Sequence, residues 1–275
     1  MGRDVVDRIV EFTRRTTELT ADQARPLRIG WSFASPSIDV AWGLNHLRIA
    51  APTAFDEAIA LADETQADLP YRRITVEPAA ISPALEAAFT AAGWKIERDL
   101  LMVHAWDPDR EIDTSCVTDV EQTDHLKLGR LWSREEAPGI RDDVLDALVE
   151  FWRREAEARG DRLLGVLDPD RKRVLAKAKL RSDGEIAQVE DVYTVAEARG
   201  RGLGRALVTR AVQLAQSERH ELIFIVADED DWPKRLYAQI GFEPVGRIVH
   251  FHREVPTSPP VPDALSRRRT ALPSA

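Results

Sequence analysis

A glycine-rich segment joins a predicted strand to a predicted helix. Residues 192–207 read VYTVAEARGRGLGRAL, so three glycines and three arginines stand at one strand-to-helix junction. Glycine lets the backbone adopt positive φ and approach a ligand closely. The N–H groups of such a loop, together with those of the first helical turn, form an anion site that suits a pyrophosphate. The segment therefore predicts an α/β fold with a phosphate-binding loop.

The spacing of these glycines decides which phosphate ligand the loop fits. A dinucleotide fingerprint requires G-x-G-x-x-G, and counting from either of the first two glycines brings an arginine or a leucine to the last position. A phosphate loop that ends in Gly-Lys-Ser/Thr is absent from the sequence. The pattern present is Arg199-x-x-Gly202-x-Gly204. It resembles the coenzyme A loop of the GNAT superfamily of N-acetyltransferases, which reads Arg/Gln-x-x-Gly-x-Gly/Ala.

A second motif supports this resemblance. Residues 236–242, LYAQIGF, resemble the family's Leu-Tyr-x-x-x-Gly-Phe. In that family the strand before the loop pairs with the pantetheine arm, and the loop amides hold the pyrophosphate. The resemblance therefore implies acetyl-CoA as co-substrate. The residues that it implies for binding acetyl-CoA are Val192, Tyr193, Thr194, Arg199, Gly200, Arg201, Gly202, Leu203, Gly204, Arg205 and Asp231.

Asp231 departs from the family pattern, which often has asparagine six residues before the motif's tyrosine. A carboxylate accepts a hydrogen bond from a pantetheine amide but donates none.

The chemistry of amide formation points to two catalytic candidates. The amine must lose a proton, the oxyanion needs a hydrogen-bond donor, and the departing thiolate benefits from an acid. By resemblance, Tyr237 is the acid and Glu190, on the strand before the loop, is the base. Regular strand alternation puts Glu190 and Val192 on one face and Asp191 on the other, so both carboxylates cannot face the substrate unless a bulge intervenes. Backbone N–H groups near Val192 are the oxyanion donors that the resemblance implies.

Apolar periodicity predicts alternating helices and strands along the chain. The predicted helices cover residues 4–19, 55–65, 81–92, 124–136, 142–158, 204–217 and 232–240. The predicted strands are a pair within 26–38, then 41–49, 71–76, 95–104, 112–120, 162–167, 174–180, 187–194, 222–226 and 242–253.

The two halves of the sequence repeat one plan at an offset of 148 residues. The segment around Gly93 parallels the segment around Gly241, and the predicted strands at 41–49 and 71–76 fall on strands of the second half. Three elements that agree without a gap indicate a duplication. The chain is thus similar to tandem GNAT proteins, with a mixed sheet in each α/β domain.

The first copy lacks the cofactor chemistry. At the same offset the glycine loop falls on residues 51–56, APTAFD, which hold neither glycine nor arginine, and Tyr237 falls on Phe89. We therefore predict a degenerate domain without a cofactor loop at residues 1–107 and a catalytic domain at 108–254. Residues 255–275, rich in proline and arginine, are predicted to form a mobile tail.

Composition excludes several classes of function. The net charge of −9 argues against general nucleic-acid binding. Apolar runs of membrane-spanning length and an N-terminal signal core are absent, so we expect a cytoplasmic protein without membrane attachment. The single Cys116 forms no intramolecular disulfide, and we expect it to be a small buried residue. His250 and His252 share a strand face, but no third ligand is evident, so we expect a solvated face and no metal.

Aromatic residues mark the predicted cores and the acceptor side. Trp132, Phe151 and Trp152 stand on the two helices that border the acceptor pocket in GNAT proteins, although core packing is the commoner role. Glu135 and Glu136 are candidates to contact a cation there. Trp31, Trp42 and Trp94 suit the core of the first half or a contact between the halves.

Together these observations predict an N-acetyltransferase that transfers an acetyl group from acetyl-CoA to the primary amine of a small molecule in a ternary complex. Two alternatives stay open: a non-catalytic acyl-CoA-binding sensor or scaffold, and an acetyltransferase of protein lysines or N-termini. The sequence does not choose an acceptor. We expect a monomer, because the fused first half covers apolar surface and a sheet edge that would otherwise promote dimerisation, and a homodimer remains the alternative.

Overall fold

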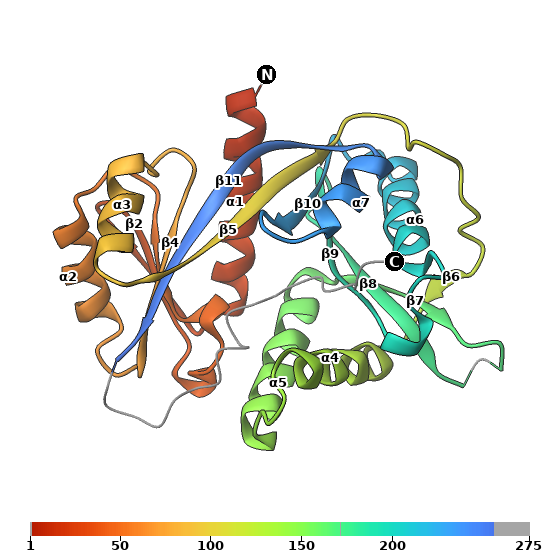
Figure 1. The fold of residues 1–275 in the computed structure, drawn as a ribbon, viewed down its shortest axis with the longest axis horizontal. Coiled ribbons are helices and arrows are strands. Elements are labelled where there is room, and N and C mark those ends of the chain that lie inside the picture. The colour runs from red at the N-terminus through yellow and green to blue at the C-terminus, as the bar shows by residue number, and fades with distance from the viewer. Residues whose placement is uncertain (1, 171, 256–275) are drawn as a thin grey trace.

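The structure is a computed structural model that describes residues 2–170 and 172–255 (Figure 1). Apart from Val255, the predicted tail at 255–275 lies outside the described residues. Within the described part of the chain, eleven strands form one continuous mixed sheet. The strands are β1 (Gln23–Leu27), β2 (Gly30–Ala34), β3 (His46–Ile49), β4 (Tyr71–Val76), β5 (Lys95–His104), β6 (Val117–Asp119), β7 (Arg162–Leu167), β8 (Val174–Ser182), β9 (Ile186–Thr194), β10 (Leu222–Asp228) and β11 (Phe242–Glu254).

Helices cover both faces of this sheet. They are α1 (Gly2–Thr20), α2 (Phe55–Thr65), α3 (Pro83–Ala91), α4 (Gln122–Glu136), α5 (Asp142–Arg159), α6 (Leu203–Ser217) and α7 (Pro233–Ile240), with short 3-10 turns η1 (Pro36–Ile38), η2 (Trp42–Leu44) and η3 (Ala196–Ala198). In the first half, α2 and α3 pack on one face. In the second half, α6 and α7 pack on one face and α4 packs on the other. Helix α1 packs against β5 and β11 and contacts α5, so it lies where the halves meet (Figure 1).

The two halves exchange their last strands. The order across the sheet is β1-β2-β3-β4-β11-β5-β10-β9-β8-β7-β6. Strand β11 pairs antiparallel with β4 of the first half, and β5 pairs antiparallel with β10 of the second half. In Figure 1 these two long strands run side by side between the halves. One sheet therefore includes strands from both sides of the predicted domain boundary, which lies between residues 107 and 108. That boundary stays a prediction.

The helices and most strands lie where the sequence predicts them. The strands at 71–76, 95–104 and 162–167 and the helix at 55–65 have the predicted bounds. Two strands are shorter than expected. Of residues 41–49 only the last four are strand, because residues 42–44 form a 3-10 turn, and of residues 112–120 only Val117–Asp119 pair.

Helices and strands follow one another in the same order in the two halves, as the predicted repeat requires. Helix α2, strand β4, helix α3 and strand β5 correspond to α6, β10, α7 and β11. Gly93 and Gly241 each follow the second helix of their copy, with φ of 74° and 108°. At Gly241 a Cβ atom would lie 1.9 Å from the carbonyl oxygen of Trp106, so that position admits only glycine.

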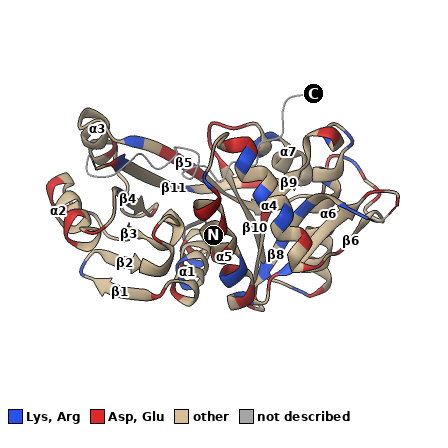
Figure 2. Ribbon diagram, turned by 90° about the horizontal axis from the view of Figure 1, so that it is seen from below, with Lys and Arg blue, Asp and Glu red and all other residues tan. Residues whose placement is uncertain are grey.

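One expectation about a surface residue is wrong. Cys116 is exposed and precedes β6, so the prediction that it is buried in a strand is wrong. Figure 2 shows acidic and basic residues interspersed over both halves in that view. No helix in the described part of the chain is long and apolar enough to cross a membrane.

Candidate functional site

A cavity of about 320 Å³ lies between the two halves and is lined by residues of both. Ligand pockets are usually about 300–1,000 Å³, so this is a small one. Both predicted catalytic residues, Glu190 on β9 and Tyr237 on α7, line it. So do Trp132 on α4 and Phe151 and Trp152 on α5, which the sequence placed near an acceptor pocket.

The strands that flank Glu190 part beside the cavity. Strands β9 and β10 pair in parallel from Ile186 and Leu222 up to Val189 and Ile225, where the register ends. Beyond that point β9 continues to pair with β8 on its other side. The backbone of residues 190–194 is therefore free of β10 on the side where an extended ligand could add hydrogen bonds.

A β-bulge occurs where the strands part. Lys177 of β8 pairs with Tyr193 and Lys179 pairs with Glu190, so β9 has one more residue than β8 between these pairs. Asp191 takes a φ of 61°, which is uncommon for a non-glycine residue, although aspartate tolerates it better than most. The bulge breaks the strand alternation, which is the exception that the sequence left open, and both carboxylates line the cavity.

A buried lysine holds Asp191 in this conformation. Lys177 Nζ lies 2.9 Å from Asp191 Oδ2, and the two side chains are only 2% and 10% exposed. Burial by itself would raise the pKa of Asp191, but the charges of Lys177 and Lys179 outweigh it and hold the pKa far below its usual range. Burial, together with Lys177, holds the pKa of the nearby His125 well below its usual value. Asp191 thus stays ionised and takes up a proton reluctantly.

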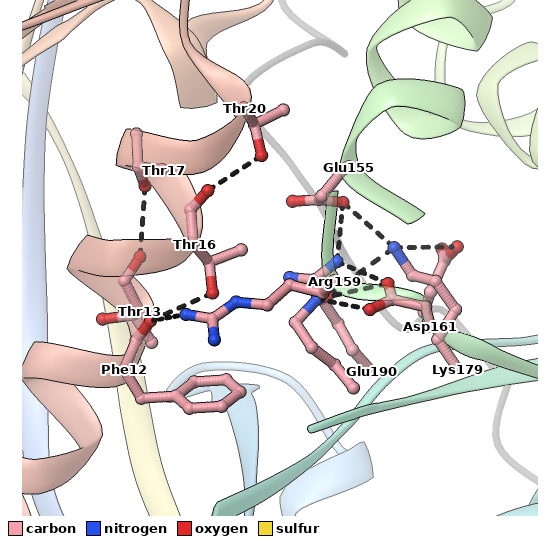
Figure 3. A network of polar contacts seen from close by, with 12 residues as sticks. Phe12, Thr13, Thr16, Thr17, Thr20, Glu155, Arg159, Asp161, Lys179 and Glu190 are labelled. Atoms are coloured by element: carbon pink, nitrogen blue, oxygen red, sulfur yellow. Dashed lines mark hydrogen bonds and ion pairs between the residues drawn. The ribbon is translucent and has the colours of Figure 1, made fainter. Parts of the chain in front are cut away.

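Glu190 belongs to a second set of buried ion pairs. Its carboxylate lies 3.1 Å from the guanidinium of Arg181 and 3.6 Å from Nζ of Lys179. Both cations also contact Glu155 of α5, at 3.2 and 3.0 Å. Lys177, Lys179 and Arg181 are buried at alternate positions of β8. Figure 3 shows Lys179 between Glu155 and Glu190.

The same region is linked to the first half through Arg159, at the end of α5. Its guanidinium donates a hydrogen bond to the carbonyl oxygen of Phe12 on α1, at 3.3 Å, and lies 4.7 Å from the centre of the Phe12 ring (Figure 3). Strand β9 is therefore linked, through β8 and α5, to a helix of the other half.

Tyr237 lies on the opposite side of the parted strands. It is 1% exposed and packs in the core between α6, α7 and the sheet. Pro233 begins α7, and Gly241 ends it with a left-handed residue. Both residues can be recognised in the sequence, and they set the two ends of the helix that carries Tyr237.

The glycine loop has the backbone that an anion site requires. Gly200 and Gly202 have φ of 74° and 78°, and Gly202 is the N-cap residue of α6. Because residue 202 has no side chain, it offers no cap to the first N–H groups of α6, including those of Leu203 and Gly204. Those donors and the helix dipole favour a bound anion there.

The three arginines of the loop are engaged within the protein. Arg199 donates to the carbonyl oxygen of Thr194, at 3.0 Å, and pairs with Glu135. Arg201 is exposed and donates to the carbonyl oxygen of Glu197, at 2.9 Å.

Arg205 is buried and bonds Asp109 and Gln239, at 2.7 and 2.5 Å. It thus ties the segment after β5 to α7. Of the three side chains, that of Arg201 is the one at the surface of the loop.

The remaining predicted coenzyme residues lie at the end of β9 and after β10. Val192, Tyr193 and Thr194 are buried, with Val192 in the core under α6 and Tyr193 donating its hydroxyl proton to Glu135 at 2.8 Å. Asp231 lies in the turn before α7 and accepts a hydrogen bond from the N–H of Trp232, at 2.7 Å.

The comparisons with known proteins agree with this geometry. Residues 128–242 match the model of the acetyltransferase (GNAT) family. The match covers most of the second half and less than half of the whole chain. Among curated protein sequences there is no significant match.

Solved structures extend the likeness to the whole fold. A GCN5-related N-acetyltransferase from Kribbella flavida is 19% identical, with a TM-score of 0.61, and the match covers 94% of this chain and 97% of that one. A functionally unknown conserved protein from Staphylococcus epidermidis is 11% identical, with a TM-score of 0.67 over 86% and 95% of the two chains. A tandem GNAT protein from the clavulanic acid biosynthesis pathway is 16% identical, with a TM-score of 0.51 over 91% and 97%. These likenesses show that the fold is shared with tandem GNAT proteins.

Strands β4, β5 and β11 contribute a polar wall to the cavity. His250 on the exchanged strand β11 contacts Thr75 Oγ1 at 3.0 Å and Asp99 Oδ2 at 3.1 Å. His252 lies 3.2 Å from a guanidinium nitrogen of Arg73 and is 3% exposed. The prediction of a solvated histidine face is therefore wrong. The described residues contain no group of three or more His, Cys, Asp and Glu side chains that could hold a metal.

Sequence reasoning missed this wall because its residues come from three separate strands and α1. The signal available was the alternation of polar residues in strands predicted to be buried, namely Arg73 and Thr75 on β4 and Glu97 and Asp99 on β5. Their shared face became evident only when β11 was found between β4 and β5.

The first half lacks the opening that the GNAT domain has. Its parallel strands β3 and β4 stay paired up to Ile49 and Val76, and Glu77 N–H still donates to Ile49 at 2.9 Å. Phe89, at the position of Tyr237 in the repeat, is fully buried and stacks on Phe251 with a centroid distance of 4.0 Å. These contacts fill the place where the other half has its site.

Proposed function

We propose that the chain is an acetyl-CoA-dependent N-acetyltransferase that acts on a small-molecule primary amine held between its two halves. The observation that carries the proposal is that Glu190 and Tyr237 line one cavity at the point where β9 and β10 part. The GNAT-family match over residues 128–242 supports acyl transfer as the reaction class.

The residues around the glycine loop fit the co-substrate. The backbone of residues 190–194 would pair with the pantetheine arm, and the first amides of α6 beyond Gly202 would hold the pyrophosphate. The co-substrate supplies an activated thioester, and the reaction forms an amide while the thiol of coenzyme A leaves.

Each catalytic residue has a proton to move. Glu190, which lies between Arg181 and Lys179, accepts the proton that the ammonium must lose, directly or through water. Tyr237 donates a proton to the departing thiolate. The backbone N–H of Val192, a residue of the bulge, would donate to the oxyanion. Asp191 is the weaker candidate for the base, because the neighbouring lysines hold its pKa so low.

Acetyl-CoA turnover with an amine library tests the proposal. The purified protein is mixed with acetyl-CoA and each amine, and free thiol is followed. Tyr237→Phe should leave acetyl-CoA affinity nearly intact and lower turnover by about 10²–10⁴-fold, the usual contribution of a positioned acid. Glu190→Gln should cost most at low pH, where more of the amine is protonated. Unchanged turnover in both variants would contradict these roles.

A second candidate is a sensor that binds acyl-CoA without turnover. The observation that favours the sensor is that Glu190 already has two cationic neighbours. A carboxylate with a purely structural role in an ion-pair network would have the same contacts. Tight binding of acetyl-CoA with no thiol release for any amine would select the sensor. We further propose that the protein acts as a monomer in either case, which sedimentation analysis would check.

A further inference from the structure

The lining of the cavity carries more negative than positive charge. Among the described residues that line it, seven are Asp or Glu and three are Arg. Opposite charges attract most strongly where water is excluded, so such a cavity favours a cationic ligand over an anionic one.

The three arginines are already bonded to carboxylates of the protein. The shortest such contacts join Arg48 to Glu77 at 2.5 Å, Arg73 to Glu97 at 2.8 Å and Arg181 to Asp161 at 2.8 Å. An acceptor that carries a carboxylate or phosphate would compete with these buried pairs, and breaking one is costly.

The carboxylates gather at two separated places. Glu190 marks the reacting end, where Tyr237 also lines the cavity. Asp99 and Asp228 mark the other end and are directly opposite one another on β5 and β10. Asp99 already contacts His250 Nε2, at 3.1 Å, and Asp228 accepts a hydrogen bond from the N–H of Asp230, at 2.7 Å. Like charges directly opposite in a sheet repel, and a cation between them adds a favourable contact with both.

The sheet register gives the separation of the two ends. Asp228 lies three residues beyond Ile225, and Glu190 lies one residue beyond the partner of Ile225, Val189. At about 3.3 Å per residue along a strand and about 4.8 Å between strands, the two Cα atoms are at least roughly 8 Å apart. A ligand with two amino groups joined by a short methylene chain spans such a separation.

The surface between the two ends is apolar. Ile225, Val226 and Ile248 line the cavity there. Such a surface suits methylene groups rather than hydroxyls, since an unpaired hydroxyl loses its bonds to water on burial.

The wall on α1 is poor in hydrogen-bond donors. Thr13, Thr16, Thr17 and Thr20 line the cavity, and each donates its hydroxyl proton to a backbone carbonyl of the preceding turn. Figure 3 shows the bonds of Thr16, Thr17 and Thr20. Only their oxygen lone pairs remain for a ligand, so this wall also favours a ligand that donates hydrogen bonds.

We propose that the acceptor is an aliphatic diamine or a longer polyamine. Its reacting amino group lies beside Glu190 and Tyr237, its methylene chain lies along Val226 and Ile248, and its second ammonium lies against Asp99 and Asp228. This inference rests on the proposed N-acetyltransferase function and names its substrate class. The specificity of the GNAT domain is thereby set partly by Asp99, a residue of the half without a coenzyme loop.

The test compares matched amines. Thiol release from acetyl-CoA is measured at one pH with linear diamines of three to six carbons and with the monoamines of equal length. The expected kcat/KM is at least about tenfold higher for the best diamine, the size of one favourable charge contact. Asp99→Asn and Asp228→Asn should each bring that ratio close to one. The ratio is internal to each variant, so partial loss of folded protein cancels.

Glu229→Gln is the control, because it removes a charge next to Asp228 from a residue that does not line the cavity and that lies near Arg98 and Arg247 instead. Its ratio should equal that of the unmodified protein. Equal rates for diamines and monoamines, or a preference for amino acids, would overturn the diamine inference and leave the N-acetyltransferase function standing. No thiol release with any amine would overturn the proposed function, and this inference with it.

Discussion

Removing one partner of the buried pair of Lys177 and Asp191 should strongly destabilise this protein. Lys177→Met removes the ammonium that lies 2.9 Å from the carboxylate and keeps a side chain of similar length between Trp132 and Trp152, whose rings lie 5.9 and 6.0 Å from Nζ. Packing is then largely preserved, and the main effect is a buried carboxylate without its closest cation.

Breaking such a pair from one side typically costs about 3–5 kcal/mol. Lys179 remains 3.8 Å from Asp191, so the lower end, about 3 kcal/mol, applies here. For a chain of this size that corresponds to a fall in Tm of roughly 6–12 °C. Urea and thermal unfolding followed by circular dichroism would measure the loss.

Two further variants separate this explanation from a general effect of losing a lysine. Lys172→Met removes a lysine whose contact with Asp170, at 3.8 Å, is exposed to solvent, and it should change the free energy of unfolding by less than about 0.5 kcal/mol. Lys177→Met combined with Asp191→Asn removes the uncompensated charge and should regain at least about 1 kcal/mol relative to Lys177→Met alone. A loss below about 1 kcal/mol in Lys177→Met, or no recovery in the double variant, would refute the reasoning.

Three other predictions concern the loop, the acid range and the first half. Gly202→Val should weaken acetyl-CoA binding at least about tenfold in calorimetry, because a side chain at φ 78° strains the loop and lies at the anion site, whereas Gly184→Val, equally strained at φ 96° in a distant turn, should not. The pKa of Asp191 is depressed in the folded state, so the stability that its ionised carboxylate contributes is complete above the unfolded pKa of about 3.9. That stability is lost as the pH falls below this value. The unmodified protein should therefore lose more stability between pH 5 and pH 3 than Asp191→Asn does. A fragment that begins at residue 108 should aggregate or dimerise on size-exclusion chromatography.

Local signals in the sequence were sufficient to place most elements. Gly160 and Gly241 end helices in the left-handed conformation, and Pro233 begins one, as residue type predicts. The loop from Gly200 to Gly204 could be predicted for the same reason. The positions of Gly200 and Gly202 reflect a positive φ that glycine adopts easily.

The bulge at Asp191 could not be predicted, because its cause is not local. The extra residue of β9 is stabilised by Lys177 from β8, under Trp132 and Trp152 from two helices. An alternating pattern of Glu190, Asp191 and Val192 fits a regular strand equally well. Only the three-dimensional position of the lysine selects the bulged form, which brings both carboxylates to the cavity.

The exchange of strands was hidden for a similar reason. Strands β5 and β11 occupy equivalent places in the repeat and have alternating residues, so either could pair with β4 or with β10. Because the exchange was not foreseen, the wall formed by His250 and Asp99 was not foreseen either. Non-local pairing of this kind leaves no periodic signal in the chain.

The exchanged strand β5 explains why the first half is needed although it lacks a coenzyme loop. Strand β9 leaves β10 after Val189 and Ile225, so from there to Asp228 β10 has β5 as its paired neighbour, in register up to Asp99. The end of β10 leads directly into α7, which carries Tyr237. In a fragment that begins at residue 108, this stretch of β10 has neither neighbour, and β11 loses its pairing with both β4 and β5. The exposed edges promote association, and α7 loses the support that places Tyr237. A soluble, monomeric fragment with full turnover would show that the second half positions its tyrosine without β5.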